Sequence, residues 1–207
     1  MPRSSVTRTA EGKILSRLRG KGRGKVYTNK DFLDLATRAA TDRVLSHLCR
    51  EGILQRVDRG IYYYPETNQR LGITLSPNPN DVAAAVARKT GSRLQPSGSV
   101  AANLLGLTTQ VPATLVYQTD GPPKTIHSGN QTIVLKHVPP RELTDRATMS
   151  RLIILAFRHL GREAVDDSVV RKLRSTLSEA DKRELLKDVS HQTDWIVAAA
   201  KKIAANK

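Results

Sequence analysis

The most regular alternation of apolar and polar positions along the chain lies in residues 41–51. Val44, Leu45 and Leu48 recur at a spacing that places them on one side of an α-helix, and Thr41 is a suitable N-terminal cap. The opposite side carries polar and basic residues, namely Arg43, Ser46, His47 and Arg50. The pattern predicts an amphipathic helix that packs through one face and exposes a basic face.

A tight β-hairpin is predicted immediately after this helix. Residues 53–54 are apolar, Gly60 occupies the last position of a three-residue turn, and residues 62–64 are all Tyr, which favours a strand. Arg56 and Arg59 are therefore expected near the tip of the hairpin. The alternative interpretation is an exposed helix and hairpin whose charges are merely solvated.

A first helix and a glycine-rich basic loop precede this region. Thr9 caps a helix over residues 9–19, in which apolar residues recur at helical spacing. The following GKGRGK segment presents three cations, Lys21, Arg23 and Lys25. A phosphate-binding P-loop requires Ser or Thr where Val26 stands, so a nucleotide site is not expected. The segment is interpreted either as a flexible loop that contacts nucleic-acid phosphates or as a solvated turn.

A second, short helix is predicted between the loop and the basic amphipathic helix. Thr28 and Asp31 have the spacing of a helix-capping pair, and the apolar residues Phe32, Leu33 and Leu35 follow as the expected buried side. A turn over residues 37–40 then leads into the next helix.

The order of these elements is that of a winged helix-turn-helix: helix, short strand over residues 26–27, helix, turn, helix and two-stranded wing. In that fold the start of the second helix contacts phosphate through its amides, and the recognition helix enters the major groove of DNA. The predicted DNA-binding residues are Lys21, Arg23, Lys25, Thr28, Asn29, Thr41, Arg43, Ser46, His47, Arg50, Arg56 and Arg59.

The charge distribution supports a polyanionic partner for the N-terminal third. The formal net charge of the chain is +15. Residues 1–64 contain 14 Lys and Arg against 6 Asp and Glu, whereas the much longer remainder contains 20 against 13. Solubility alone can also explain an excess of cations, but the cations are densest where the winged helix is predicted.

Two further compositional features limit the function classes. The chain has no apolar run of the ~20 residues that span a membrane, and no apolar signal segment at its start, so a cytoplasmic location is expected. The single cysteine, Cys49, rules out an internal disulfide and a zinc cluster, and it is expected to be a small packed hydrophobe.

Two sequence blocks carry a family resemblance. The first runs from Thr28 to Pro65 and contains LxxLxxxGIL and RGIYYYP; the second is QPSGSVAANLLGLTTQVP, followed by LVYQTDGPPKTIHSGNQTIVLKHVPPREL. Over roughly residues 5–145 the chain resembles the AbiEi antitoxins of type IV toxin-antitoxin systems. The resemblance implies an antitoxin that represses its own operon and counteracts a nucleotidyltransferase-like toxin without a stable complex between the two proteins.

The rest of the chain predicts a second, mixed domain. Loop composition around residues 68–80 suggests a boundary, which gives a winged helix-turn-helix domain over residues 1–70 and an α+β domain over residues 71–207. The second domain is expected to contain a helix starting at Asp81, a short helix starting at Ser99, a small antiparallel sheet and a C-terminal helical bundle. The strands of that sheet are predicted over residues 114–119, 124–127 and 132–137.

No catalytic, cofactor or metal site is expected in this domain. A hydrolase triad drawn from Ser97, Ser99, Asp120, His127 and His137 lacks the GxSxG elbow, and the two histidines lack a third metal ligand. The bundle's apolar stripes are expected to be buried, with a partner surface as an alternative for Trp195 and for the basic end, Lys201, Lys202 and Lys207.

Three classes of function remain open from the sequence. The favoured interpretation is a DNA-binding antitoxin and autorepressor, with double-stranded operator DNA and a nucleotidyltransferase-like toxin as partners. The alternatives are a winged-helix regulator without a toxin partner and an RNA-binding module, since basic winged helices also bind structured RNA. An enzyme is the weakest candidate because no acid-base or metal constellation is present.

Overall fold

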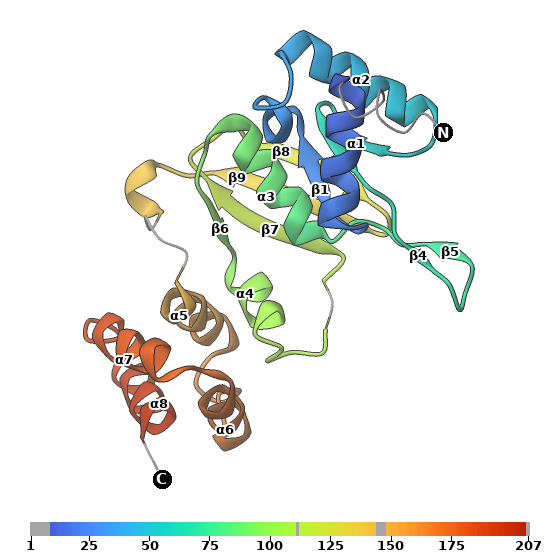
Figure 1. Ribbon diagram of the computed structural model, residues 1–207. Helices are drawn as coiled ribbons and strands as arrows, with labels where there is room; N and C mark the ends of the chain where they lie inside the picture. Colours follow the sequence, from blue (N-terminus) through green and yellow to red (C-terminus); the bar gives the residue numbers. More distant parts are fainter. Residues whose placement is uncertain (1–8, 111, 144–147, 206–207) are drawn as a thin grey trace. The chain divides into compact units, whose positions relative to one another are not determined.

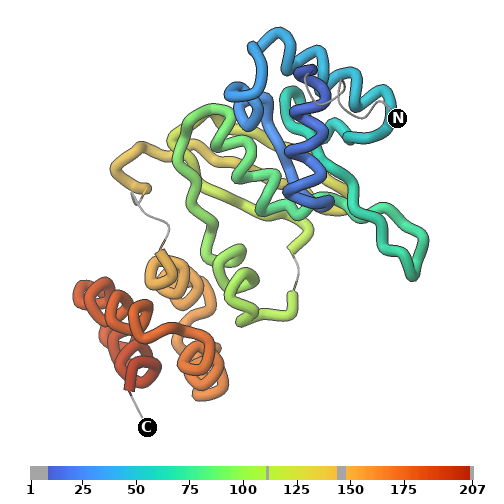
Figure 2. The backbone as a smooth tube through the Cα atoms, in the orientation of Figure 1, coloured from blue at the N-terminus to red at the C-terminus, as the bar shows by residue number. Residues whose placement is uncertain are grey.

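The computed structural model describes residues 9–110, 112–143 and 148–205 (Figures 1 and 2). These residues form helices and small sheets, which confirms the predicted α+β class. The chain divides into two compact units: Met1–Leu94 with Thr119–His137, called unit 1, and Gln95–Gln118 with Val138–Lys207, called unit 2. The folding boundary predicted after residue 70 stays a prediction.

The N-terminal part of unit 1 combines three helical segments with a three-stranded sheet. Its elements are α1 (Ala10–Lys21), β1 (Val26–Thr28), the 3₁₀ helix η2 (Asn29–Phe32), α2 (Arg38–Arg50), β2 (Gln55–Asp58) and β3 (Ile61–Tyr63). The strand order is β1-β3-β2, and both neighbouring pairs are antiparallel. Thr28 lies opposite Ile61, so β1 pairs with the edge of β3 that the β2–β3 hairpin leaves open.

Unit 1 contains five further elements within the described residues. They are β4 (Thr67–Asn68), β5 (Ile73–Thr74), α3 (Pro79–Thr90), β8 (Lys124–Ser128) and β9 (Gln131–His137). The helix α3 contacts β1, η2, β3 and β9. Arg88 Nη2 donates a hydrogen bond to the carbonyl oxygen of Val26 at 3.1 Å, which ties α3 to β1.

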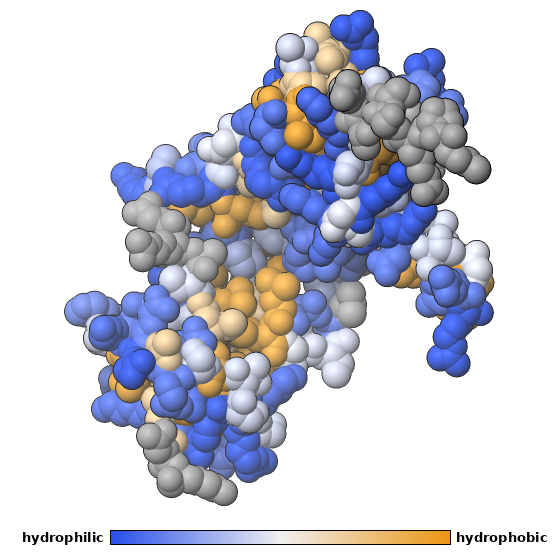
Figure 3. All heavy atoms as spheres, in the orientation of Figure 1, coloured by the Kyte–Doolittle hydropathy of each residue, from blue (hydrophilic) through white to orange (hydrophobic). Residues whose placement is uncertain are grey.

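One hydrophobic core joins α1, η2 and α2 to the three-stranded sheet. The residues that it buries come from α1, β1, η2, α2 and the β2–β3 hairpin: Ile14, Leu18, Tyr27, Phe32, Leu45, Leu48, Leu54, Tyr62 and Tyr64. Cys49 packs against this core, and burial raises the pKa of its thiol, as expected for a packed rather than reactive cysteine. Hydrophilic residues cover most of the surface seen around α1 and α2 in Figure 3.

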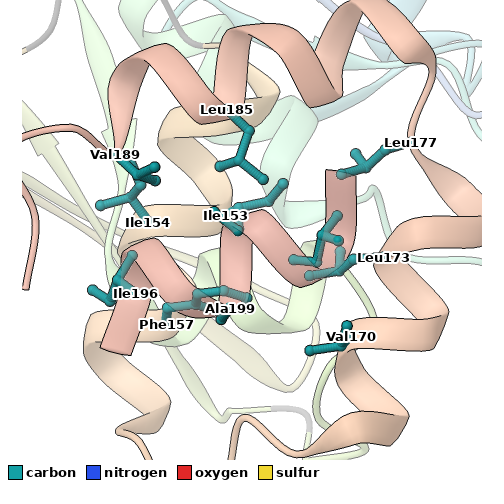
Figure 4. Packing of buried hydrophobic residues seen from close by; sticks show 12 residues of the cluster. Ile153, Ile154, Phe157, Val170, Leu173, Leu177, Leu185, Val189, Ile196 and Ala199 are labelled. Carbon is teal, nitrogen blue, oxygen red and sulfur yellow. The ribbon is translucent and has the colours of Figure 1, made fainter. Parts of the chain in front are cut away.

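Unit 2 is mainly helical. Its elements are β6 (Leu94–Pro96), α4 (Gly98–Leu104), β7 (Thr114–Thr119), η3 (Pro140–Glu142), α5 (Met149–Leu160), α6 (Asp167–Thr176), α7 (Glu179–Asp188) and α8 (Asp194–Ala204). The first residue of β6 and the last residue of β7 belong to unit 1. The last four helices share a core that includes Ile153, Phe157, Leu173, Leu185 and Ile203, as the close view in Figure 4 shows for most of its members. Trp195 is half-buried at the edge of this core, where its ring stacks on that of Phe157 at 6.2 Å between centroids.

Several predicted boundaries agree with the structure. Thr9 caps α1 by accepting a hydrogen bond from the Gly12 amide at 3.1 Å. The strand predicted over residues 114–119 is β7, and the strands predicted over residues 124–127 and 132–137 are β8 and β9. Lys207, part of the predicted basic end, lies outside the described residues.

The start of α2 was predicted wrongly. The helix begins at Arg38, and its cap is Thr37, whose Oγ1 accepts a hydrogen bond from the Ala40 amide at 3.4 Å. Residues 38–40 therefore form the first turn of the helix rather than a separate turn, which places Thr41 inside the helix. The sequence offers two threonines as caps, and two alanines, which favour helix, follow the earlier one.

Three smaller predictions also need correction. The second predicted helix is a single 3₁₀ turn, η2, and Leu33, expected on its buried side, is 43% exposed. The cap of α3 is Asn78 rather than Asp81, because Pro79 supplies the first helical residue. The cap of α4 is Ser97, so Ser99 lies within the helix.

Candidate nucleic-acid interface

The outer face of α2 is exposed and basic. Arg43 and Arg50 are exposed, and Ser46 is half-buried beside them. On the opposite face Leu45 and Leu48 are fully buried in the core of unit 1. The core contacts of the two leucines therefore fix which way the arginines point, and the helix presents both guanidinium groups to the outside.

His47 lies beside these arginines between two carboxylates. Its Nδ1 is 3.6 Å from Glu11 Oε1 on α1, and its Nε2 is 3.9 Å from Glu51 Oε1 at the end of α2. The side chain of His47 is 43% exposed. Both separations exceed hydrogen-bond length, and they become ion pairs when the imidazole is protonated. The sequence pattern missed Glu11 because it is 36 residues away from His47.

The β2–β3 hairpin presents two further arginines. Arg56 is exposed on β2, with its guanidinium carbon 5.7 Å from the centre of the Tyr62 ring. Arg59 is exposed in the turn. Gly60 has a φ of 72°, a left-handed conformation that glycine adopts without strain. The hairpin forms where it is predicted, but its turn has two residues, Arg59 and Gly60, rather than three, because Asp58 pairs with Ile61 after a register shift at Val57.

The basic loop is attached to the end of β3. Gly24 donates its amide to the carbonyl oxygen of Tyr64 at 2.8 Å, and Tyr64 donates its amide to the carbonyl oxygen of Lys25 at 2.9 Å. Arg23 Nη1 donates to the carbonyl oxygen of Pro65 at 2.9 Å, and its guanidinium lies 4.8 Å from the centre of the Tyr64 ring. Lys21 and Lys25 are exposed. The two backbone bonds hold Gly24 and Lys25 beside the hairpin, and Arg23 also holds the loop in place, whereas Lys21 is the last residue of α1.

Three predicted contact residues are buried and have partners inside unit 1. Thr28 and Thr41 are 0% exposed, and Asn29 is 4% exposed. The Thr28 hydroxyl lies 3.2 Å from Asp31 Oδ2, and Asn29 Nδ2 donates to an oxygen of Asp42 at 3.1 Å.

Thr41 faces inward because α2 starts earlier than predicted, and its hydroxyl is 3.5 Å from the carbonyl oxygen of Ala36. The prediction that these three side chains contact DNA is therefore corrected. The amide contact predicted at the second helix stays a prediction for the amides of Asn29 and Lys30, whereas the amide of the cap residue Thr28 is already bonded to Asp31 Oδ2 at 2.7 Å.

Two exposed cations near this surface were not predicted. Lys30 lies in η2 and Arg38 opens α2, and both are exposed. Arg38 Nε is 3.4 Å from Asp42 Oδ2, one turn further along the helix. The prediction of Thr41 as the cap left Arg38 outside the helix, whereas the Thr37 cap places it in the first turn.

The polar residues considered for catalysis have local partners instead. Asp120 is bonded to Arg93, His127 Nδ1 is 3.2 Å from Thr132 Oγ1, and His137 Nδ1 is 2.9 Å from the carbonyl oxygen of Gly121.

Comparison with protein families gives one match. Residues 13–185 match the family described as "Family of unknown function (DUF6088)". The match covers more than half of the chain. The chain belongs to this family. No curated protein matches it.

The DUF6088 match includes nearly the whole candidate interface. It begins within α1 and ends within α7, so it contains the basic loop, α2, the β2–β3 hairpin and most of the helical bundle. Within the described residues of this DUF6088 chain, no group of three or more His, Cys, Asp and Glu is arranged to hold a metal ion. No described helix is both long enough and apolar enough to cross a membrane.

Proposed function

We propose that the N-terminal part of unit 1 is a winged helix-turn-helix that binds double-stranded DNA. The order α1, β1, η2, α2, β2, β3 and the strand order β1-β3-β2 support this proposal. In it α2 is the recognition helix and the β2–β3 hairpin is the wing. The observation that carries the proposal is the pair of exposed arginines, Arg43 and Arg50, on the face of α2 opposite the core.

The side chains of this surface suit different parts of a DNA duplex. Arg43 and Arg50 are candidates for the major groove, where a guanidinium donates two hydrogen bonds to guanine, and Ser46 can accept or donate beside them. Lys21 and Lys25 are candidates for phosphate contacts on one side of the helix. Arg56 and Arg59 would contact the backbone or the minor groove from the wing. His47 would add a charge-assisted contact only when protonated.

The biological role that we propose is that of an antitoxin which represses its own operon. It rests on the resemblance of the two sequence blocks to AbiEi antitoxins. The functional partner would be a nucleotidyltransferase-like toxin, and both proteins would act in the cytoplasm without a stable complex. The protein would act by binding and not as an enzyme. A regulator without a toxin partner would keep the same DNA surface.

The DNA-binding proposal is tested by fluorescence anisotropy with the full-length protein. The probes are a duplex from the promoter of its own operon, a scrambled duplex and an RNA hairpin. We expect the promoter duplex to bind most tightly. Arg43→Ala and Arg50→Ala should each lose about 1–3 kcal/mol of discrimination against the scrambled duplex. Arg70→Ala, which removes an exposed arginine of the same unit beyond the wing, is the matched control.

Two outcomes would overturn the proposal. Equal binding of both duplexes by wild type and variants removes sequence-specific recognition. Tighter binding of the RNA hairpin favours the RNA-binding alternative.

The antitoxin role is tested separately, by expressing the chain together with the nucleotidyltransferase-like protein of its operon and measuring growth. Failure to restore growth removes the antitoxin role and leaves the repressor.

A further inference from the structure

Four cations from four separate elements gather at the tip of the β2–β3 hairpin. They are Arg38 at the start of α2, Arg59 in the turn, Lys89 near the end of α3 and Lys124 at the start of β8, and we call them the tip cluster. Lys89 Nζ donates a hydrogen bond to the carbonyl oxygen of Arg59, and Lys124 Nζ forms an ion pair with Asp58. The cluster therefore joins the hairpin to parts of unit 1 that lie 30 and 66 residues away in sequence.

The hairpin turn packs closely against Lys89. A Cβ added to Gly60 would lie 3.3 Å from Lys89 Cε and 3.4 Å from its Nζ. The aliphatic part of Lys89 thus supports the turn, while its ammonium group stays at the same end of the hairpin as the exposed Arg59 guanidinium. An ammonium group has three donors, and the carbonyl oxygen of Arg59 uses one of them.

The four cations of the tip cluster are paired with only two carboxylates among the described residues. Asp58 pairs with Lys124, and Asp42 pairs with Arg38. Within the described residues, neither Arg59 nor Lys89 forms an ion pair. Burial lowers the pKa of Lys89, and the neighbouring charges of Lys124, Arg59 and Arg38 lower it further against the opposing effect of Asp58. Like charges held together in this way repel one another, and an incoming anion relieves that repulsion.

We propose that the tip cluster binds a backbone phosphate of the DNA duplex that α2 contacts. The DNA surface then extends beyond the winged helix to α3 and β8. This inference rests on the proposed function, because it assigns a second contact to the same ligand. Duplex DNA is the occupant because Lys89 is hydrogen-bonded to Arg59 in the turn of the wing and Lys124 is paired with Asp58 beside it, so the cluster is continuous with the proposed interface.

The test measures how DNA affinity of the full-length protein depends on salt. Each phosphate contact contributes about −0.9 to the slope of log K against log salt concentration for duplex DNA. Lys89→Met keeps an unbranched stem against Gly60 and removes the charge, and Arg59→Ala removes the exposed guanidinium. We expect each variant to reduce the slope by about 0.9 and to weaken promoter and scrambled duplexes by the same factor. Arg70→Ala again serves as the control and should leave the slope unchanged.

The outcomes separate this inference from the function on which it rests. If wild type binds duplex DNA with a clear salt slope and Lys89→Met keeps that slope, the tip cluster makes no phosphate contact beyond the wing, whatever the slope of Arg59→Ala. If wild type shows no salt-dependent binding of duplex DNA, the proposed function itself fails. Should Lys89→Met lower the melting temperature strongly, Lys89→Gln decides instead, because glutamine keeps a donor for the carbonyl oxygen of Arg59 and removes only the charge. A slope lost only on an RNA hairpin would assign the cluster to RNA and overturn the inference.

Discussion

Asp120 accepts two hydrogen bonds from Arg93, one from its backbone amide at 2.7 Å and one from its Nε at 2.8 Å. Next to this pair, Thr119 Oγ1 donates to the carbonyl oxygen of Arg93 at 2.7 Å. The segment that enters β6 is thereby joined to the segment that leaves β7. The hydrogen bond from the Arg93 side chain, together with that from its amide, holds the pKa of Asp120 below its ordinary value.

We predict that this carboxylate contributes to a loss of stability in acid. Because its pKa is lower in the folded chain than in the unfolded chain, its contribution is fully present above the ordinary value of 3.8 and is lost as the pH falls through the lowered value. Urea midpoints measured from pH 7 down to pH 3 should fall less in Asp120→Asn than in wild type. Parallel pH profiles for the two proteins would contradict this role.

Gly98 is predicted to tolerate no side chain. A Cβ at this position would lie 2.5 Å from His159 Cβ and 2.7 Å from the backbone oxygen of Leu155, so α4 would have to move away from α5. Gly98→Ala should lower the free energy of unfolding by about 1–3 kcal/mol.

Gly20→Ala in α1 is the matched control, because a Cβ there meets nothing within 4 Å. It should stabilise the chain by about 0.5–1 kcal/mol, since alanine favours helix. Thermal melts of the two variants that shift in the same direction would refute the packing argument.

The packing of the bundle core can be tested by substituting two leucines and following unfolding through the fluorescence of one tryptophan. Leu173 on α6 is 2% exposed, whereas Leu186 on α7 is 39% exposed. Leu173→Ala should cost about 2–5 kcal/mol of unfolding free energy, and Leu186→Ala about 0.5 kcal/mol or less. Trp195 is the only tryptophan of the chain and packs against this core, so its fluorescence during urea unfolding reports on the bundle. Equal costs for both variants would show that Leu173 is not part of a packed core.

The burial of Thr41 gives a prediction that separates folding from DNA binding. Thr41→Val removes a hydroxyl 3.5 Å from the carbonyl oxygen of Ala36 and should change stability by about 1 kcal/mol or less. Its affinity for the promoter duplex, measured by anisotropy, should equal that of wild type, while Arg43→Ala should weaken it. A loss of affinity in folded Thr41→Val would restore Thr41 to the DNA surface.

Substitution of two cations in the basic loop, Lys25 and Arg23, should affect DNA binding and stability differently. Lys25→Ala removes an exposed cation, so the salt slope of DNA binding should fall by about 0.9 with no change in melting temperature. Arg23→Ala should also weaken binding to all sequences and lower the slope, but it should lower the melting temperature as well, because Arg23 is bonded to Pro65 and lies over Tyr64. A slope unchanged in both variants would exclude the loop from the interface.

Local patterns in the sequence predicted most of the helices and strands. The Thr9 cap of α1, the strand β7 and the bundle helices follow from spacings within about ten residues, which are visible along the chain. The start of α2 was less certain because Thr37 and Thr41 both suit a cap, and the structure uses the earlier one. The error placed Thr41 on the wrong face.

Distant contacts could not be predicted from one sequence. Glu11 beside His47, and Lys89 and Lys124 at the hairpin tip, are brought together by the fold and not by spacing. The burial of Asn29 has the same origin, since its partner Asp42 takes up a donor that the pattern left available for phosphate. The bond between Thr28 and Asp31, in contrast, joins residues three positions apart and agrees with the capping pair predicted there. The exposed arginines of α2 were predictable because one helical turn determines their direction.

The chain passes between its two units three times, so truncation of the gene at one point cannot separate the units. The polypeptide leaves unit 1 after Leu94, returns at Thr119 and leaves again after His137, so neither unit is a continuous stretch of sequence. A single cut by a protease or a single truncation point therefore cannot release either unit whole. Each unit therefore needs segments from more than one part of the gene, and a shortened gene that ends after the β2–β3 hairpin also loses β8 and β9.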